Sequence, residues 1–132
     1  MTTRLTVIAI LAACIALTPV VSAQDPVKVD PQHYSVVSEN DQVRILKVHY
    51  GPHEKSVMHS HPASVAVFLT EGKGQFTFPG GKVQDFSANA GQAQYEPAVT
   101  HLPENTGDSG LDVIVTELKG HHAKAHKAEK KE

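Results

Sequence analysis

The sequence predicts a single, small all-β domain built as a sandwich or barrel, and three observations support this fold class. The chain has 132 residues, which is room for one domain. Between residues 34 and 118, short apolar runs recur and are separated by turn signals rich in Gly, Pro, Asn and Asp. No segment in this region has the periodicity of a convincing amphipathic helix.

The expected strands follow one another closely along the chain. The run 43–50 alternates, which places Leu46, Val48 and Tyr50 on one face. The run 65–70 is almost wholly apolar, which predicts burial on both of its faces. Further strands are expected at 57–61, 75–78, 83–86, 93–96, 100–102 and 111–118. The glycines of the segment 79–82 favour a hairpin turn, and Phe76 and Tyr95 are expected to be core aromatics.

Residues 1–23 have the organisation of a secretory signal peptide. A basic start at Arg4 is followed by an apolar run and then by the small residues of Val21-Ser22-Ala23, which a signal peptidase would recognise. The apolar run is shorter than the roughly 20 residues that span a bilayer, so no integral membrane span is expected. Cys14 also fits a bacterial lipobox, and a lipid anchor there is the alternative to free export into the periplasm or medium.

The segments that flank the domain are polar. Residues 24–33 contain two prolines and are expected to be extended. Residues 119–132 form a His/Lys-rich tail that is expected to be disordered. Residues 24–118 contain six Lys/Arg against twelve Asp/Glu, a net charge of −6 that argues against nucleic acid as a partner.

Three of the nine histidines are candidates for one metal site. His59 and His61 are two residues apart on an expected strand, so their side chains leave the same face. His101 follows about forty residues later on another strand, which a barrel could bring alongside. Neutral imidazole suits Zn, Fe, Cu and Ni, whereas exposed or core histidines are the alternative interpretation.

These histidines stand in two runs that resemble the two motifs of the cupin family. The first run comprises Gly51, His59-Ser60-His61, Val65 and Gly72; the second comprises Gly91, Pro97, His101 and Asn105. The resemblance covers residues 43–118 and implies a cupin barrel, that is, a double-stranded β-helix or jelly roll. It also implies metal binding by His59, His61 and His101, and a structural turn role for Asn105.

The first run departs from the cupin motif at its carboxylate ligand. Counting from His61 and from Gly72 places Val65 where the family carries glutamate. The implied site is therefore three histidines, as in the thiol and diketone dioxygenases that the family includes. Glu104 is a candidate partner for an imidazole, and His53 and Glu54 are candidates to contact substrate or supply a proton. An exposed loop pair is the alternative for these last two.

The sequence therefore predicts an exported small cupin that binds one divalent metal ion. Fe(II) is expected first, with Mn, Ni, Cu or Zn after it. An oxygenase acting on a small organic molecule is one expected function, with cavity walls formed by Val65, Val67, Leu69, Phe76 and Phe78. A non-catalytic periplasmic protein that binds metal or a small ligand is the other, and pairing into a homodimer is a further expectation.

Overall fold

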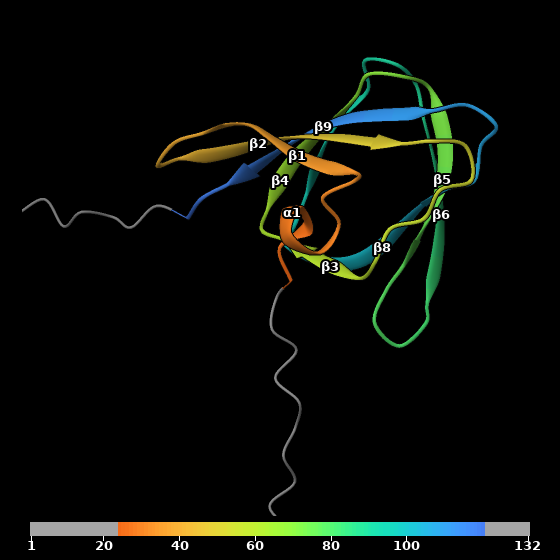
Figure 1. The fold of residues 1–132 in the computed structure, drawn as a ribbon, viewed down its shortest axis with the longest axis horizontal. Coiled ribbons are helices and arrows are strands. Elements are labelled where there is room, and N and C mark those ends of the chain that lie inside the picture. Colours follow the sequence, from red (N-terminus) through yellow and green to blue (C-terminus); the bar gives the residue numbers. More distant parts are fainter. Residues whose placement is uncertain (1–23, 121–132) are drawn as a thin grey trace, which may run out of the picture.

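The computed structural model describes residues 24–120, which form two antiparallel sheets packed face to face (Figure 1). The expected signal peptide and nearly all of the expected tail lie outside the described residues. The larger sheet has the strand order β1-β2-β9-β4-β7 and the smaller sheet has the order β3-β8-β5-β6. The strands are β1 (Tyr34–Glu39), β2 (Val43–Tyr50), β3 (His59–His61), β4 (Ser64–Phe68), β5 (Gly72–Thr77), β6 (Val83–Ala88), β7 (Ala93–Glu96), β8 (Val99–Asn105) and β9 (Leu111–Leu118).

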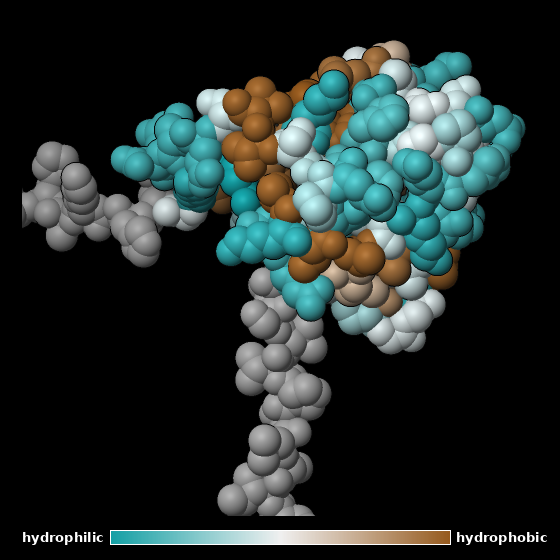
Figure 2. All heavy atoms as spheres, viewed as in Figure 1, coloured by the Kyte–Doolittle hydropathy of each residue, from teal (hydrophilic) through white to brown (hydrophobic). Residues whose placement is uncertain are grey.

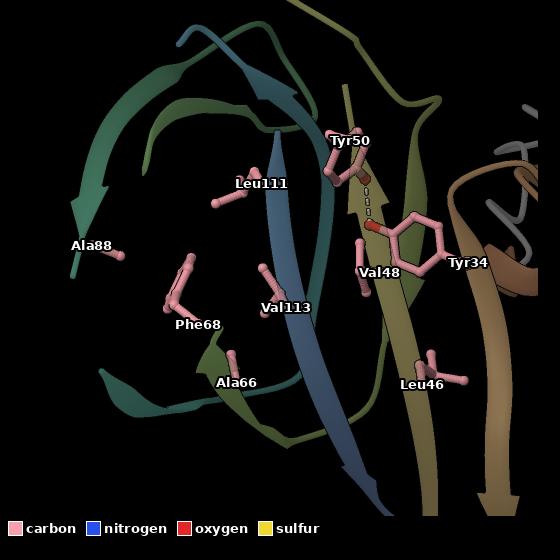
Figure 3. Close-up of a cluster of buried hydrophobic side chains, with 9 residues drawn as sticks. All are labelled: Tyr34, Leu46, Val48, Tyr50, Ala66, Phe68, Ala88, Leu111 and Val113. Atoms are coloured by element: carbon pink, nitrogen blue, oxygen red, sulfur yellow. Dashed lines mark hydrogen bonds between the residues drawn. The ribbon is translucent and has the colours of Figure 1, made fainter. Parts of the chain in front are cut away.

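The core lies between the two sheets and is built by the alternation of the strands. Leu46, Val48 and Tyr50 of β2 are buried, as their spacing predicts. They pack with residues from β1, β4, β6 and β9 (Figure 3). The remaining buried members of this cluster are Tyr34, Ala66, Phe68, Ala88, Leu111 and Val113.

Strand β4 is not buried on both faces, which corrects the expectation from its composition. Its inward residues are Ser64, Ala66 and Phe68, whereas Val65 and Val67 face outward and are only half-buried. Beyond its end, the side chain of Leu69 is 50% exposed. Because the side chains of a strand alternate with period 2, one face of β4 must point away from the core. No second layer among residues 24–120 covers that outer face.

The outer face of the larger sheet carries apolar side chains on several strands. Ile45, Val65 and Tyr95 lie in one cross-strand row with Thr116, and Ile114 and Val67 lie in the next row with Lys47. Tyr95 is 63% exposed, so it is not a core aromatic as its composition suggested. In Figure 2, apolar surface gathers over the region that Figure 1 labels β1, β2 and β9.

The segment 24–33 is not extended as expected but contains the one-turn helix α1 (Pro26–Val29). The Asp25 side chain accepts the backbone N–H of Val27, and proline suits the first position of a helix because its fixed φ is already helical. The backbone carbonyl of Gln24 accepts the N–H of Ser60, 2.9 Å away on β3. The segment is therefore fastened to the strand that carries two of the candidate metal ligands.

Two local features complete the fold. Gly80 and Gly81 both have positive φ, of 88° and 87°, and they form the turn between β5 and β6 as their sequence predicted. Strand β1, which the sequence did not indicate, is an edge strand with a register irregularity between Val36 and Ser38. Within residues 24–120 the structure contains no helix that is long and apolar enough to cross a membrane.

Candidate metal centre

The three histidines singled out in the sequence converge between the sheets. His59 and His61 lie on β3, and His59 is directly opposite His101 on the neighbouring strand β8. One ring nitrogen from each histidine lies within 4.8 Å of the others. His59 and His61 are 1% and 6% exposed, so both imidazoles are removed from water. Antiparallel pairing thus joins ligands that are forty residues apart in the chain.

Hydrogen bonds on the outer side of the rings fix how two of the histidines are protonated. His59 Nδ1 lies 2.8 Å from the carbonyl oxygen of Val57, and His61 Nδ1 lies 2.7 Å from a carboxylate oxygen of Glu117. Both partners only accept hydrogen bonds, so each Nδ1 carries the proton and donates it. In the neutral rings, each Nε2 therefore presents a lone pair to the centre of the cluster.

The chemistry of these nitrogens fits a bound cation. His59 Nε2 and His61 Nε2 are only 3.0 Å apart, and two lone pairs at this distance repel each other unless a proton or metal ion lies between them. Two nitrogens that each lie about 2.1 Å from one ion at a right angle would be about 3.0 Å apart. Among the described residues, the buried His101 Nε2 has no hydrogen-bond partner. A divalent metal ion would satisfy all three nitrogens at once.

Burial keeps two of the imidazoles neutral at physiological pH. Desolvation, with the nearby His61 adding to it, lowers the pKa of His59 to about 4. Desolvation and the other two rings lower the pKa of His101 to about 3. Metal ligation requires an unprotonated nitrogen, so these rings are held in the form that binds metal.

A chain of three charged side chains, buried at Glu117 and half-buried at Arg44 and Asp25, lies on the outer side of His61. Glu117 is 2% exposed and also accepts a bond from Arg44 Nε, 2.6 Å away. Arg44 in turn makes a bidentate pair with Asp25, with N–O distances of 3.0 and 3.1 Å. Although burial acts to raise it, the pKa of Glu117 is lowered because His61 and Arg44 donate to its charged form. Glu117 therefore stays ionised beside His61.

No feature of the sequence indicated this role for Glu117. The residue is the last but one of strand β9 and lies fifty-six residues from its partner His61. Its inward direction could have been read from the alternation of Leu111, Val113 and Val115, which lie on the same face. Its hydrogen bond to His61 depends on which strands are neighbours, and no local pattern contains that information.

The N-terminal segment supports His59 in a similar way. Asp30 is 4% exposed; it accepts bonds from the Ser56 hydroxyl and from His33 Nδ1. Ser56 Oγ also lies 3.4 Å from His59 Nδ1. The ring of Tyr34 packs against His59 with a centroid distance of 4.9 Å. Residues just before the barrel thus pack against the candidate metal ligand His59 on one side.

A cavity of about 420 Å³ opens beside the histidines. His61 and His101 form part of its wall, and Phe76 stacks on His101 with a centroid distance of 4.9 Å and an interplanar angle of 15°. Phe78 also lines it, so two of the five expected wall residues are confirmed; Val65, Val67 and Leu69 are not part of the lining. The volume and the aromatic walls suit a small organic ligand.

The position on β4 where a motif carboxylate would face the site is Ala66, not Val65 as counted in the sequence. Val65 faces outward, and the neighbouring inward position on β4 is Ala66, which lines the cavity. The motif allows a spacing of three or four residues after the second histidine, and the longer spacing leads to Ala66. Neither residue can ligate a metal, so the expectation of a site without the motif carboxylate is unchanged.

The other sequence candidates lie around the site but not in it. His53 is exposed, with Nε2 2.8 Å from Asp108, and it does not line the cavity. Glu54 is also outside the lining; it accepts the backbone N–H of Gly51 and lies 3.2 Å from His33 Nε2. Neither residue is among those that line the cavity.

Asn105 and Glu104, at the end of β8, have different roles. Asn105 is 1% exposed, and its side chain binds the carbonyls of Gly51 and Ser109 and the N–H of Gly107. Its expected structural role in the turn is therefore confirmed. Glu104 lines the cavity and pairs with Lys55 at 3.4 Å, and no imidazole is among its hydrogen-bond partners in the described residues.

Two packed antiparallel sheets with three histidines between them define a double-stranded β-helix protein with a candidate metal centre. Residues 46–117 match the cupin domain family (Cupin_2), so the chain belongs to this family. No protein of curated function matches the sequence.

Solved structures support the same fold. A cupin domain from Bordetella pertussis is 22% identical with a TM-score of 0.62, and the match covers 66% of this chain and 92% of that one. An uncharacterized double-stranded β-helix protein from Klebsiella pneumoniae is 21% identical with a TM-score of 0.54, covering 67% and 76%. A cupin superfamily protein from Desulfitobacterium hafniense is 15% identical with a TM-score of 0.51, covering 66% and 76%. At these identities the likeness concerns the fold alone.

Proposed function

We propose that the protein binds one divalent metal ion through His59, His61 and His101 and uses it to oxygenate a small organic substrate. The observation that carries this proposal is the convergence of the three imidazoles. Two of them, His59 and His61, have Nε2 lone pairs only 3.0 Å apart, and His101 has a buried Nε2 without a partner among residues 24–120. Fe(II) is the first choice of metal, with Mn, Ni, Cu or Zn after it.

The metal would supply Lewis acidity and a common binding point for substrate and oxygen. The chain supplies the remaining requirements. Glu117 and the Val57 carbonyl orient the rings of His61 and His59, and the aromatic cavity wall excludes water from the ligand. Three neutral ligands leave the full positive charge on the ion, which favours a substrate with an ionisable chelating group.

The alternative is a binding protein that holds a metal ion or small ligand without turnover. The absence of a carboxylate at Ala66 favours it, because many cupin sites use that anionic ligand. In this case the cavity would bind its ligand stoichiometrically, and no product would form under oxygen. The two functions share one metal centre and differ only in turnover.

The metal centre can be tested by elemental analysis of the full-length product exported by a bacterial host, purified anaerobically without an affinity tag. We expect about one equivalent of metal in the parent and none above background in a His59→Gln/His61→Gln/His101→Gln variant. Because both proteins keep the histidines of the tail, the difference reports on the barrel alone. Equal metal content in the two proteins, after reconstitution with Fe(II), would overturn the proposal.

Catalysis is tested separately on the iron-loaded protein. We expect oxygen uptake that depends on both iron and a chelating organic substrate in a screen of enols, thiols and catechols. Stoichiometric ligand binding with no oxygen uptake across the screen would favour the alternative. Mass spectrometry of the exported product also tests its localisation: cleavage after Ala23 indicates free export, and a lipidated Cys14 indicates an anchor.

We further propose that the protein forms a homodimer through the outer face of the larger sheet. Its support is the row of Ile45, Val65 and exposed Tyr95, in which Thr116 is the polar member, since a solvated sheet face normally carries polar side chains throughout. Analytical ultracentrifugation would show a dimer for the parent and a monomer for Val65→Lys. A monomeric parent at micromolar concentration would contradict the pairing.

A further inference from the structure

We propose that the cavity selects a ligand whose part beyond the metal-chelating group is uncharged or cationic and carries hydrogen-bond donors, and that Glu96 contacts this part of the ligand and disfavours anionic groups there. This inference deepens the proposed function, and it depends on the metal centre described above. It assigns a binding role to a residue outside the three-histidine set.

The position of Glu96 follows from the register of the larger sheet. Strand β7 alternates, so Gln94 and Glu96 face inward and line the cavity, whereas Tyr95 faces outward. Glu96 is opposite Ser64 on β4, and Ser64 is opposite Glu117 on β9. Because neighbouring strands are about 4.8 Å apart, the backbone of Glu96 lies roughly 10 Å from that of Glu117 on the same inward face. Glu117 in turn holds the ligand histidine His61.

The charge of the cavity lining is entirely acidic apart from its histidines. Among residues 24–120, no Lys or Arg lines the cavity, and the two charged residues of the lining are Glu96 and Glu104. The charge of Glu104 is compensated by Lys55 at 3.4 Å. In the part of the chain that the structure describes, no cationic group lies within ion-pair distance of Glu96. Glu96 is therefore the uncompensated charge of this wall.

The hydrogen-bonding capacity of Glu96 is only partly used. One carboxylate oxygen accepts a bond from the Gln94 side-chain amide, which in turn accepts from Gln92. An ionised carboxylate has about four acceptor positions, so Glu96 can still accept bonds from a ligand's hydroxyl or amino groups. A ligand carboxylate or phosphate at the same place would meet like charge in a site without a basic residue, which is unfavourable.

The rest of the lining favours a flat apolar body. Phe76 is stacked between His101 and Phe86, with centroid distances of 4.9 and 4.6 Å. Phe68 and Phe78 also line the cavity. A ring placed between these aromatics and Glu96 would have an apolar face on one side and a carboxylate on the other. The structure thus favours an aromatic molecule that chelates the metal at one end and is neutral or cationic elsewhere.

The experiment compares three catechols that share the same chelating group and differ in the charge of one substituent. They are 4-(aminomethyl)catechol, 4-methylcatechol and 3,4-dihydroxybenzoate, titrated calorimetrically under nitrogen into the zinc-loaded protein, which does not turn them over. We expect the parent to bind the benzoate on the order of tenfold more weakly than the methyl compound. In Glu96→Gln this ratio should fall towards the value for free zinc, because the amide keeps the acceptor but removes the charge.

Glu104→Gln is the matched control, since it removes an acid of the same cavity whose charge Lys55 already compensates. It should leave the ratio within about twofold of the parent. Zinc content is measured first, so the two proposals fail in different ways. A chain without zinc contradicts the metal centre, whereas a zinc-loaded parent that binds the benzoate as tightly as 4-methylcatechol, or a Glu96→Gln variant with an unchanged ratio, overturns the role of Glu96.

Discussion

At the scale of single residues, the protonation of the candidate metal ligands is decided by the groups behind them. A carbonyl oxygen holds the Nδ1 proton of His59, and the carboxylate of Glu117 holds that of His61. A carboxylate behind an imidazole also makes the ring more basic and orients it. Glu117 would therefore act on a bound metal ion without contacting it, as a positioning residue for His61.

Replacing Glu117 by Gln tests this role. The amide oxygen can still accept the proton of His61, but the negative charge is lost and Arg44 keeps only Asp25 as an anionic partner. We expect zinc affinity to fall by about 10- to 100-fold, as is typical when the outer partner of a ligand histidine is changed. A competitive titration with a chromophoric chelator measures the affinity at constant pH.

A second acid provides the control for this substitution. Glu39 pairs with Lys119 on the surface, 2.6 Å away, so Glu39→Gln removes an ion pair that includes none of the groups bonded to the three histidines. Its zinc affinity should match the parent within about twofold. If Glu117→Gln is folded by circular dichroism and binds zinc as tightly as Glu39→Gln does, the positioning role is wrong.

The depressed pKa values of the buried histidines make the stability of the metal-free protein depend on pH. In the folded chain the pKa of His59 is about 4 and that of His101 about 3, both below the ordinary 6.5. The unfolded chain therefore binds more protons below pH 6.5, and stability is lost as the pH falls from 6.5 towards 4. The loss is about 1.4 kcal/mol per pH unit for each histidine in this window.

Urea unfolding at pH 7, 6 and 5 in the presence of a chelator measures this dependence. We expect His101→Gln to lower the slope below pH 6.5 by about one proton relative to the parent. His49→Gln, which alters an exposed surface histidine, is the comparison and should retain the parent slope. Parallel slopes for the parent and His101→Gln would contradict the prediction.

At the scale of elements, the sequence predicted the bounds of a strand correctly wherever the strand's own residues and flanking turns mark them. The bounds of β2, β7 and β9 match the expected ranges because each strand has its alternation and its flanking turns within a few residues. The prediction was wrong for the faces of β4 and β7, where composition was used instead of alternation. Placing Tyr95 in the core implied that its neighbour Glu96 faces outward, so an acid that lines the cavity and has no cationic partner among residues 24–120 was overlooked.

Strand β5 has a close contact that a substitution can test. At Gly74 an added Cβ would overlap the backbone oxygen of Glu104 on β8 and would lie 2.5 Å from the ring of Phe86 on β6. Both neighbours belong to the wall that includes the candidate ligand His101. We expect Gly74→Ala to destabilise the fold by about 1–3 kcal/mol, the usual cost of overpacking.

The free energy of unfolding in urea measures this cost. Gly120→Ala is the control, because nothing lies within 4 Å of a Cβ at that position, and it should change stability by less than about 0.5 kcal/mol. An unchanged unfolding free energy for Gly74→Ala would show that β5 and β8 can separate without cost.

At the scale of the whole molecule, the candidate site exists only in the folded topology. The sequence predicted the three ligands because two short motifs carry them. The supporting residues could not be predicted in the same way: Asp25, Asp30, Arg44 and Glu117 come from α1, the turn before β1, β2 and β9. Their contacts depend on the order of strands in space, which no local pattern encodes.

Because the candidate ligands and their supporting residues are spread along the chain, metal binding at this site would be coupled to the stability of the entire fold. The ligands and their supports come from both ends of the described chain, so the unfolded protein has no preformed site and metal binding stabilises only the folded state. Free zinc at 100 times its dissociation constant should then raise the unfolding free energy by about 2.7 kcal/mol. The His59→Gln/His61→Gln/His101→Gln variant should gain nothing measurable, although it retains the histidines of the tail. Thermal unfolding across a zinc titration distinguishes the cases: equal gains in both proteins would place the bound metal outside the barrel, whereas a gain confined to the parent would place it among the three histidines.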